Sequence, residues 1–303
     1  MRIALTGATG FLGGAVLGQL IAGGHQVKAL TRRPQPERAG VEWIAGDLAD
    51  VAALEALVAG TDAVIHVAGA VNAPDRDGFV AANVTGTEAL LAAAARAGIS
   101  RFVLVSSLSA REPDLSDYGW SKHAGEKAVQ ASGLDWTIVR PPAIYGPGDR
   151  EMLEMFRMAR RGLVLLPPEG RLSIIHVDDL ARLLVTLAAE GGASRHRLYE
   201  VDDGLPGGWR HRDLARALGQ AVGRRCVALP LPGAALMAGA RFDRMIRGQA
   251  AKLTPDRARY FCHPDWVADP ARAVASSLWA PRIVTAQGLA DTAAAYRAKG
   301  WLR

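Results

Sequence analysis

A tyrosine and a lysine stand four residues apart in the segment Tyr118-Gly-Trp-Ser-Lys122. On an α-helix this spacing places both side chains on one face. The phenol, which normally titrates near pH ~10, would then lie beside an ammonium that favours its ionised form. Ser106 and Ser107 come shortly before the pair. A phenolate beside a hydroxyl can take a proton from an alcohol or return one to a carbonyl, although a solvated helix face shows the same spacing by chance.

The start of the chain has a pattern that could hold a nucleotide. An apolar strand at 2–6 precedes three glycines, Gly7, Gly10 and Gly13. Residues 15–21 then have helical spacing. Strand, glycine turn and helix in this order form a dinucleotide fingerprint, here with the variant spacing GxxGxxG. The glycines let the backbone approach a pyrophosphate at the positive end of the helix, whereas the alternative is a glycine-rich turn that binds nothing.

The residues after the second expected strand, at 26–31, distinguish between two dinucleotides. A site for NAD usually offers an acidic side chain here to hold the ribose 2′-hydroxyl. This chain has Arg32 and Arg33 instead. Two guanidiniums can bind a 2′-phosphate through charge-assisted hydrogen bonds. The pattern predicts NADP(H), with NAD as the alternative if both arginines are merely solvated.

Two further strand ends have residues suited to a cofactor. Asp47 follows an expected strand at 41–44 and could bond the adenine edge, cap the next helix, or do both. Ala68 and Gly69 come after an apolar run at 63–67, which is typical of a buried parallel strand. Both residues are small enough to let a cofactor pass close to the backbone.

The next two segments lead to the acid–base candidates. Asn83 opens an alanine-rich helix that reaches about Ala97, and it either contacts backbone or water in the site or caps the helix. Residues 101–105 form another apolar strand, with Ser106 and Ser107 at its carboxyl end. Ligands of open α/β sheets lie outside these strand ends, so we expect the serines near the nicotinamide.

The composition argues against several classes of protein. The formal charge is +6 and the pI is about 9.7, but the basic residues are scattered, which favours an anionic cofactor or substrate over nucleic acid. Only two cysteines are present, Cys226 and Cys262, and no His/Cys cluster, so we expect neither a disulfide framework nor a metal site. Without a signal-peptide pattern or a long uncharged apolar run, we expect a cytoplasmic protein with no membrane span.

In combination these segments resemble the extended short-chain dehydrogenases/reductases, the group of the NAD-dependent epimerases/dehydratases. The resemblance covers nearly the whole chain. The similar segments are TGATGFLG at 6–13, GDL at 46–48, HVAG at 66–69, NVTGT at 83–87, VSS at 105–107, YGWSK at 118–122, RPPAIYGPGD at 140–149, IIHVDDLA at 174–181 and GLADTAAAYRAKGWL at 288–302.

The resemblance implies a role for each matching residue. Tyr118 is the general acid/base, and Lys122 lowers its pKa and holds the nicotinamide ribose. Ser107 polarises the substrate oxygen, with Ser106 and Ser109 as neighbouring alternatives. The expected cofactor-binding residues are Gly7, Thr9, Gly10, Phe11, Leu12, Gly13, Arg32, Arg33, Asp47, Leu48, Val67, Ala68, Gly69, Asn83, Tyr118, Lys122, Pro141, Ala143 and Ile144.

The chain departs from the family pattern at two places. Only ten residues separate Ser107 from Tyr118, as in an atypical branch related to an accessory subunit of respiratory complex I, which binds NADP without known turnover. This chain keeps the serine, tyrosine and lysine together, which favours an enzyme. Ala143 stands where nucleotide-sugar epimerases and dehydratases commonly have asparagine. The segment around it is more similar to hydroxysteroid dehydrogenases and flavanol reductases.

The expected fold is α/β: a Rossmann-type doubly wound parallel sheet with a smaller, interleaved C-terminal substrate region. Residues 1–165 would form the dinucleotide-binding domain, to which 174–202 return, with 198–201 as the last strand. Residues 166–303 would mainly bind substrate. Six residues there are candidates for substrate contact by location alone: Arg241, Arg244, Arg247, Tyr260, His263 and Trp266.

The expected activity is hydride transfer between NADP(H) and a carbonyl or secondary alcohol of a small organic substrate. One alternative is a nucleotide-sugar epimerase or dehydratase with bound cofactor. Another is a non-catalytic NADP-binding sensor or assembly subunit. The resemblance is also compatible with a homodimer through the helices after Asn83 and around Tyr118.

Overall fold

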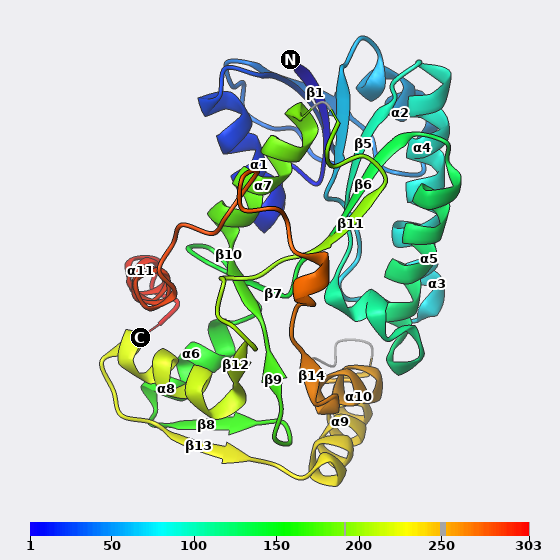
Figure 1. Ribbon diagram of the computed structural model, residues 1–303. Helices are drawn as coiled ribbons and strands as arrows, with labels where there is room; N and C mark the ends of the chain where they lie inside the picture. Colours follow the sequence, from blue (N-terminus) through cyan, green and yellow to red (C-terminus); the bar gives the residue numbers. More distant parts are fainter. Residues whose placement is uncertain (191, 249–252, 303) are drawn as a thin grey trace. The chain divides into compact units, whose positions relative to one another are not determined.

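The computed structural model describes residues 1–190, 192–248 and 253–302 (Figure 1). The chain forms two compact units, each assembled from segments that are distant in sequence. Unit 1 comprises Met1–Arg140, Leu180–Glu200 and Val274–Trp279, and unit 2 comprises Pro141–Asp179, Val201–Ala273 and Ala280–Arg303. The first compact unit is interrupted after Arg140. The expected boundary of the cofactor-binding domain at residue 165 stays a prediction, because compactness alone does not show where the cofactor-binding part ends.

Unit 1 is built on a parallel sheet. In its described part the sheet has seven strands in the order β11-β6-β5-β4-β1-β2-β3, and all neighbouring strands are parallel. The strands are β1 (Arg2–Thr6), β2 (Gln26–Thr31), β3 (Val41–Ala45), β4 (Ala63–His66), β5 (Arg101–Val105), β6 (Asp135–Arg140) and β11 (Arg197–Glu200). The strand order reverses between β1 and β4, where open α/β sheets bind their ligands. The predicted Rossmann-type fold is confirmed.

Helices cover both faces of this sheet, with α2, α4 and α5 on one face and α1 and α7 on the other (Figure 1). The helical segments of unit 1 are α1 (Phe11–Ala22), α2 (Val51–Val58), α3 (Arg76–Val80), η1 (Ala81–Thr85), α4 (Gly86–Arg96), η2 (Leu108–Arg111), η3 (Pro113–Leu115), α5 (Asp117–Ala131) and α7 (Val177–Ala189), which begins in unit 2. The core beneath α2, α4 and α5 consists of large apolar side chains, among them Leu54, Leu90, Phe102, Val129 and Ile138.

One continuous helical run in the described residues, from Arg76 through Arg96, is long and apolar enough to cross a membrane by length and composition. It consists of α3, the π-helical turn η1 and α4. Leu90, Leu91 and Ala94 of this run are buried in the core of unit 1. Buried core helices have the same composition, and packing against the sheet explains the apolar face of this one.

Unit 2 contains short strands in small sheets. β7 (Ala143–Tyr145) pairs with β10 (Ile174–His176), and β8 (Leu163–Leu166) pairs with β13 (Val227–Pro230). The third sheet joins β12 (Trp209–Arg210), β9 (Arg171–Leu172) and β14 (Asp265–Trp266). The helices are α6 (Leu153–Arg160), α8 (His211–Val222), α9 (Gly233–Arg247), α10 (Pro255–Cys262), η5 (Pro270–Arg272) and α11 (Thr285–Ala298).

The core of unit 2 includes Tyr145, Phe156, Leu214 and Tyr296. One prediction fails here, because 198–201 is not the last strand. β12, β13 and β14 follow β11 along the chain. β12 and β14 have only two residues each and β13 only four, too few to show a strand period.

Candidate active site

The loop between β1 and α1 brings backbone groups close together at the carboxyl edge of the sheet. Gly7 has φ = 77°, and a Cβ there would lie 2.8 Å from the nitrogen of Ala68. A Cβ at Gly13 would lie 1.9 Å from the carbonyl oxygen of Gly7, so neither glycine can be replaced without a shift. Gly10 caps the twelve-residue helix α1 without a side-chain hydrogen bond. The N–H groups of the first turn are thus available to an anion such as a pyrophosphate.

The other predicted residues of this loop differ in exposure. Thr9 is exposed and Phe11 is half-buried, so both reach the surface of the loop. The side chain of Leu12 is buried in the core. Leu12 therefore has only backbone atoms to offer to a ligand.

Arg32 and Arg33 follow β2 at the same edge, since β2 is the parallel neighbour of β1. Both side chains are exposed, and neither forms an ion pair with a residue that the structure describes. Thr31 fixes the turn: its hydroxyl donates to the carbonyl of Arg33 at 2.7 Å and accepts the N–H of Arg33 at 3.3 Å. The edge thus presents two cations with their charges unpaired.

Asp47 does not cap α2, so this alternative for its role is wrong. Asp50 is the cap, and its carboxylate accepts the N–H of Ala53 at 3.0 Å. Asp47 is exposed and accepts the N–H two residues further on at 2.9 Å. Leu48 packs against α4, where a Cβ at Gly86 would lie 2.8 Å from the Cβ of Leu48.

A directed chain of hydrogen bonds links the glycine loop to the helix that contains Asn83. The N–H of Ala68 donates to the hydroxyl of Thr6 at 3.1 Å, and this hydroxyl lies 2.6 Å from Nδ1 of His66. Nε2 of His66 lies 3.1 Å from the hydroxyl of Thr87, which donates to the carbonyl of Asn83 at 2.9 Å. Because the Thr87 hydrogen is used, His66 donates from Nε2 and accepts at Nδ1. Burial lowers the pKa of His66 to about 3, so the ring is neutral.

Asn83 binds backbone and is not a helix cap. Its Oδ1 accepts the N–H of Ala70 at 2.8 Å, and its Nδ2 donates to the carbonyl of Ala70 at 2.9 Å. Nδ2 also lies 2.9 Å from the hydroxyl of Ser121 on α5. Of the two predicted alternatives the structure shows the backbone contact. Asn83 lies in the π-helical turn η1, a local feature that is frequent at functional sites.

The three candidate serines have different surroundings. Ser106 donates its hydroxyl hydrogen to Glu126. Ser109 is fully buried, and its hydroxyl has no hydrogen-bond partner among the described residues. Ser107 accepts the N–H of Ser109 at 3.2 Å and is the most exposed of the three, at 8%. The role of Ser107 as the serine that meets the substrate stays a prediction, with which its greater exposure is compatible.

Tyr118 lies in the first turn of α5. Ser116 caps this helix by accepting the N–H of Gly119 at 2.9 Å. The half-buried ring of Tyr118 lies 6.0 Å from that of Phe79, at an angle of 50°. The short connection before Tyr118 forms η2 and η3, and it packs tightly on α5, since a Cβ at Gly119 would lie 2.7 Å from the carbonyl oxygen of Ser109.

Lys122 is buried one turn after Tyr118. Its Nζ donates to the carbonyl of Val105, the last residue of β5, at 2.7 Å. A Cβ at Gly69 would lie 2.7 Å from Oδ1 of Asn83 and 3.6 Å from Nζ of Lys122, so these three predicted residues lie together. Burial lowers the pKa of Lys122 to about 8, against the opposing effect of the Glu126 carboxylate.

A buried ion network that was not predicted from the sequence lies next to Lys122. Glu126 accepts two hydrogen bonds from Arg140, at 2.8 and 2.7 Å. Arg140 also donates to Glu200 at 3.2 Å. Burial disfavours the charge of Arg140, but the bonds to both carboxylates outweigh this and raise its pKa. The available signal was Glu126 four residues after Lys122, together with an arginine that ends an apolar strand.

Three predicted cofactor residues, Pro141, Ala143 and Ile144, belong to unit 2. Ala143 and Ile144 lie in β7, where Ala143 is exposed and Ile144 half-buried. Their expected place beside the nicotinamide stays a prediction. Unit 1 contains all the other predicted catalytic and cofactor-binding residues, whereas the six candidates for substrate contact belong to unit 2.

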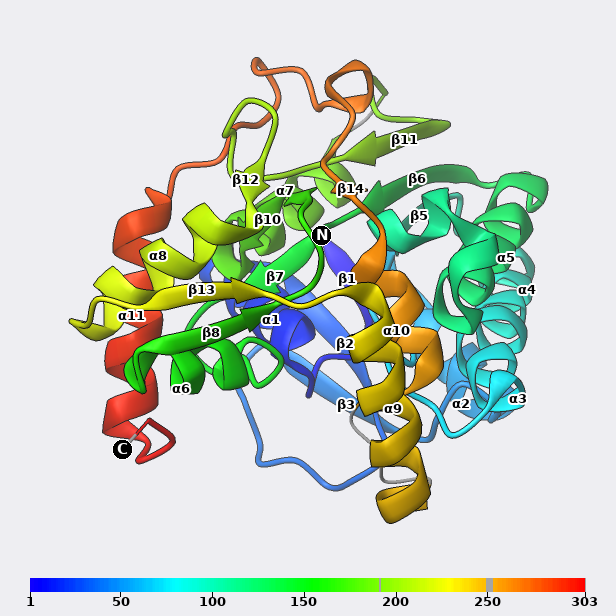
Figure 2. The same ribbon diagram turned by 90° about the horizontal axis from the view of Figure 1, so that it is seen from below.

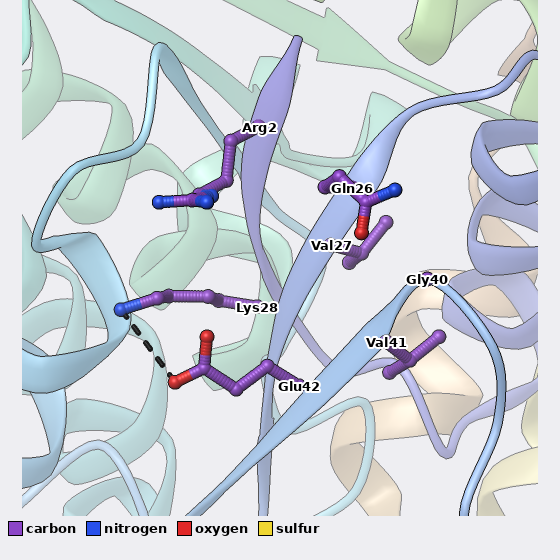
Figure 3. A pocket seen from close by; sticks show the side chains of 7 residues that line it. All are labelled: Arg2, Gln26, Val27, Lys28, Gly40, Val41 and Glu42. Atoms are coloured by element: carbon purple, nitrogen blue, oxygen red, sulfur yellow. Dashed lines mark ion pairs between the residues drawn. The ribbon is translucent and has the colours of Figure 1, made fainter.

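A hollow of about 190 Å³ lies at the amino ends of strands β1, β2 and β3 in unit 1. It is lined by Arg2, Gln26, Val27, Lys28, Gly40, Val41 and Glu42 (Figure 3). These residues begin β1, β2 and β3 or directly precede them, whereas the glycine loop follows the end of β1. Lys28 and Glu42 pair across it at 3.7 Å. The hollow is thus separate from the residues that the sequence predicts for a cofactor.

Comparisons with known proteins agree with this geometry. Residues 7–190 match a family model described as NAD(P)H-binding. The chain is 39% identical over 310 residues to the ceramide reductase of Caulobacter vibrioides (strain NA1000 / CB15N), across 99% of this chain and 96% of the relative. It is 33% identical over 309 residues to the 2-alkyl-3-oxoalkanoate reductase of Stenotrophomonas maltophilia (strain K279a), across 90% and 93%.

A solved structure has the same fold. It is that of the human epimerase family protein SDR39U1 (isoform 2) with NADPH, with a TM-score of 0.75, 22% identity and coverage of 97% of this chain and 99% of that one. The predicted enzyme class and the predicted nicotinamide cofactor, NAD(P), are confirmed. The chain belongs to the NAD(P)H-binding family, within the extended short-chain dehydrogenases/reductases of the epimerase/dehydratase type.

Proposed function

We propose that this enzyme is an NADP(H)-dependent reductase that converts a ketone of a lipid-like substrate into a secondary alcohol, with Ser107, Tyr118 and Lys122 as catalytic residues. The proposal rests on the buried ammonium of Lys122. It is held by the carbonyl of Val105, two residues before Ser107, and it lies one helical turn after Tyr118. A cation in this position favours the phenolate that remains once the phenol has given up its proton.

In the reducing direction, the hydroxyls of Ser107 and Tyr118 bind the carbonyl oxygen of the substrate. The glycine loop of unit 1 would hold the cofactor, which would supply the hydride for the carbonyl carbon when bound. Tyr118 then gives its proton to the oxygen, and Lys122 stabilises the resulting phenolate. Ser106 is excluded from this role because its hydroxyl hydrogen goes to Glu126.

The same proposal assigns the cofactor contacts. The glycine loop and the uncapped start of α1 suit a pyrophosphate. Arg32 and Arg33 suit a 2′-phosphate and support NADP over NAD. Asn83 holds the backbone at Ala70, next to Gly69, and so keeps this strand end open for the cofactor.

The names of two relatives support the proposed substrate class. One is named for ceramide and the other for an alkyl-oxoalkanoate, and both names denote amphipathic molecules with a polar group and alkyl chains. Ala143 supports this choice, since asparagine is common there in nucleotide-sugar enzymes of the family. We therefore place the substrate among long-chain ketolipids.

The experiment follows NADPH absorbance with purified protein and long-chain 3-ketolipids. Tyr118→Phe should lower kcat by about 10²–10⁴-fold, the usual contribution of a positioned acid/base, and leave the Kd of NADPH unchanged. Tyr199→Phe, at another half-buried tyrosine of unit 1, is the matched control and should keep its turnover. Unchanged turnover in Tyr118→Phe would reject the assignment.

The short connection between Ser107 and Tyr118 supports a second candidate, a binding-only NADP protein. If wild-type protein binds NADPH but consumes none with ketones, aldehydes or UDP-sugars, the binding-only function holds. Consumption with a UDP-sugar alone would instead indicate the epimerase/dehydratase branch.

A further inference from the structure

Among the described helices, α9 in unit 2 has the most exposed group of large apolar side chains. Phe242, Met245 and Ile246 are 59%, 74% and 62% exposed. Their spacing of three and four residues places them on one face of the helix. The opposite face contains Ala240, which is fully buried, and Asp243, at the side of the helix, is half-buried. α9 is therefore anchored by one side and presents the other, apolar side outward.

Exposed arginines occupy other parts of the α9 surface: Arg241 borders the apolar face, and Arg244, four residues after Ala240, lies nearer the opposite side. Arg241 and Arg244 are exposed, and neither forms an ion pair with any residue in the described ranges. Arg247 pairs with Asp243, the acidic residue of α9, at 3.2 Å. Asp243 also accepts the N–H of Leu253 at 3.0 Å. The only acidic side chain of α9 is thus engaged, and the exposed surface of the helix as a whole is cationic and apolar.

Unit 2 has a second exposed apolar face, on the small sheet that precedes α9 in sequence. The sheet of β8 and β13 exposes Leu163, Leu165, Val227 and Leu229 by 42%, 43%, 66% and 45%. Val227 is paired with Leu163 and Leu229 with Leu165, so all four lie on the same face of the sheet. The other face holds the buried Val164 and Leu166. β13 ends three residues before α9 begins, and the short connection between them can be followed in Figure 2.

We propose that α9, together with the exposed face of β8 and β13, docks on the surface of an anionic lipid bilayer. Helices that lie in a membrane interface combine bulky apolar residues on one face with Lys or Arg beside them. Phe242, Met245 and Ile246 enter the boundary between headgroups and acyl chains, and Arg241 and Arg244 contact lipid phosphates. Apolar patches of this kind mark interaction sites on a protein surface.

The charges favour a bilayer over a second copy of the chain. A two-fold contact through α9 places the same surface of each copy against the other. Arg241, at the border of the apolar face, would then approach its own counterpart, with no acidic side chain of α9 left to pair with it. An anionic lipid surface supplies the missing charge. The proposal concerns where the protein binds and holds whatever its reaction is.

The test is flotation of the full chain with vesicles of phosphatidylglycerol and phosphatidylcholine, compared with pure phosphatidylcholine. Wild-type protein should float with the anionic vesicles and be released by high salt. The variant Phe242→Ser/Met245→Ser/Ile246→Ser should bind at least about tenfold more weakly, because each buried CH₂ contributes about 0.8 kcal/mol. Arg241→Gln/Arg244→Gln should lose the preference for anionic vesicles.

Val51→Ser and Arg38→Gln are the matched controls, at an exposed valine and an exposed arginine of unit 1, and should bind as wild type does. NADPH binding, measured on each variant, shows that it is folded. The proposal fails if wild type ignores anionic vesicles or if the α9 variants float unchanged. It also fails if those variants only dissociate a dimer, since a second copy is then the occupant.

Discussion

Two exposed arginines without charged partners in the described chain are placed to select the cofactor. We predict that Arg32→Ala and Arg33→Ala each raise the Kd of NADPH by roughly 10–100-fold, since a hydrogen bond to a charged group contributes about 1.5–3 kcal/mol. The Kd of NADH should stay the same, because NADH has no 2′-phosphate. Titration calorimetry with both cofactors measures this, and Arg38→Ala serves as the control. An equal loss for both cofactors would assign the arginines to another part of the nucleotide.

The buried lysine predicts how the reaction depends on pH. Because burial lowers the pKa of Lys122 to about 8, the ammonium is present below that pH and is lost above it. The kcat/KM for reduction should therefore fall above about pH 8, by about tenfold per pH unit. Lys122→Arg should be slower but should lack this decline, since a guanidinium stays charged. A profile shared by wild type and variant would mean that another group titrates.

At the residue scale, the sequence predicts candidate functional side chains when their spacing along one helix or strand places them on the same face. Tyr118 and Lys122 are one turn apart on α5, and both follow from that spacing. Asp47 and Asp50 look alike in sequence, and only the start of α2 shows that Asp50 is the cap. Arg140 meets Glu126 from another element, a contact that no local pattern specifies.

At the element scale, the ion pair of Glu126 and Arg140 fixes α5 to β6. We predict that Glu126→Gln lowers the free energy of unfolding by about 3–5 kcal/mol, since it leaves the Arg140 charge buried without its main partner. Glu88→Gln, at an exposed position of α4, should have little effect. Urea unfolding measures both.

The double variant Glu126→Gln/Arg140→Met tests the cause. It should be more stable than Glu126→Gln, because the Arg140 charge is gone and the buried Glu200 keeps its ion pair with Arg111 at 3.6 Å. If the double variant is instead the least stable, the loss comes from packing and not from charge.

The helix around Asn83 shows why element boundaries were only partly predictable. Alanine-rich composition correctly predicts a helix that ends near residue 97, but the helical run begins at Arg76. Its middle turn η1 is π-helical. This turn contains Asn83, whose bonds to Ala70 and Ser121 come from segments outside the helix. Such distant bonds leave no periodic signal in the sequence.

At the scale of the whole molecule, the two units were predictable to different degrees. Strands such as β4 and β5 are buried at every position, so their sequences are mostly apolar and easy to recognise. Right-handed crossovers between such strands then limit the possible order of strands in the sheet. The strands of unit 2 are mostly two to four residues long and are held by pairing across long sequence distances. Their existence depends on tertiary packing that the local sequence does not specify.

The stability of the molecule in acid should depend on His66, which joins β1, β4 and α4. Its pKa is about 3 in the folded chain and 6.5 in an exposed one. Between these values the unfolded state binds a proton that the folded state does not, so stability falls as the pH drops from about 6.5 toward 3. The slope for one proton is at most about 1.4 kcal/mol per pH unit. His66→Asn should be less stable than wild type at pH 7, and the difference should shrink as the pH falls.

Chemical unfolding over this pH range compares wild type with His66→Asn, and with His196→Gln as a variant that loses an exposed histidine. Parallel curves for wild type and His66→Asn would show that His66 does not set the acid response. Nitrogen NMR of the wild-type ring gives an independent check, because the hydrogen-bond chain requires the neutral tautomer with its proton on Nε2. A ring that takes up a proton near pH 6.5 while the protein stays folded would mean that the chain from Thr6 to Asn83 is not closed as described.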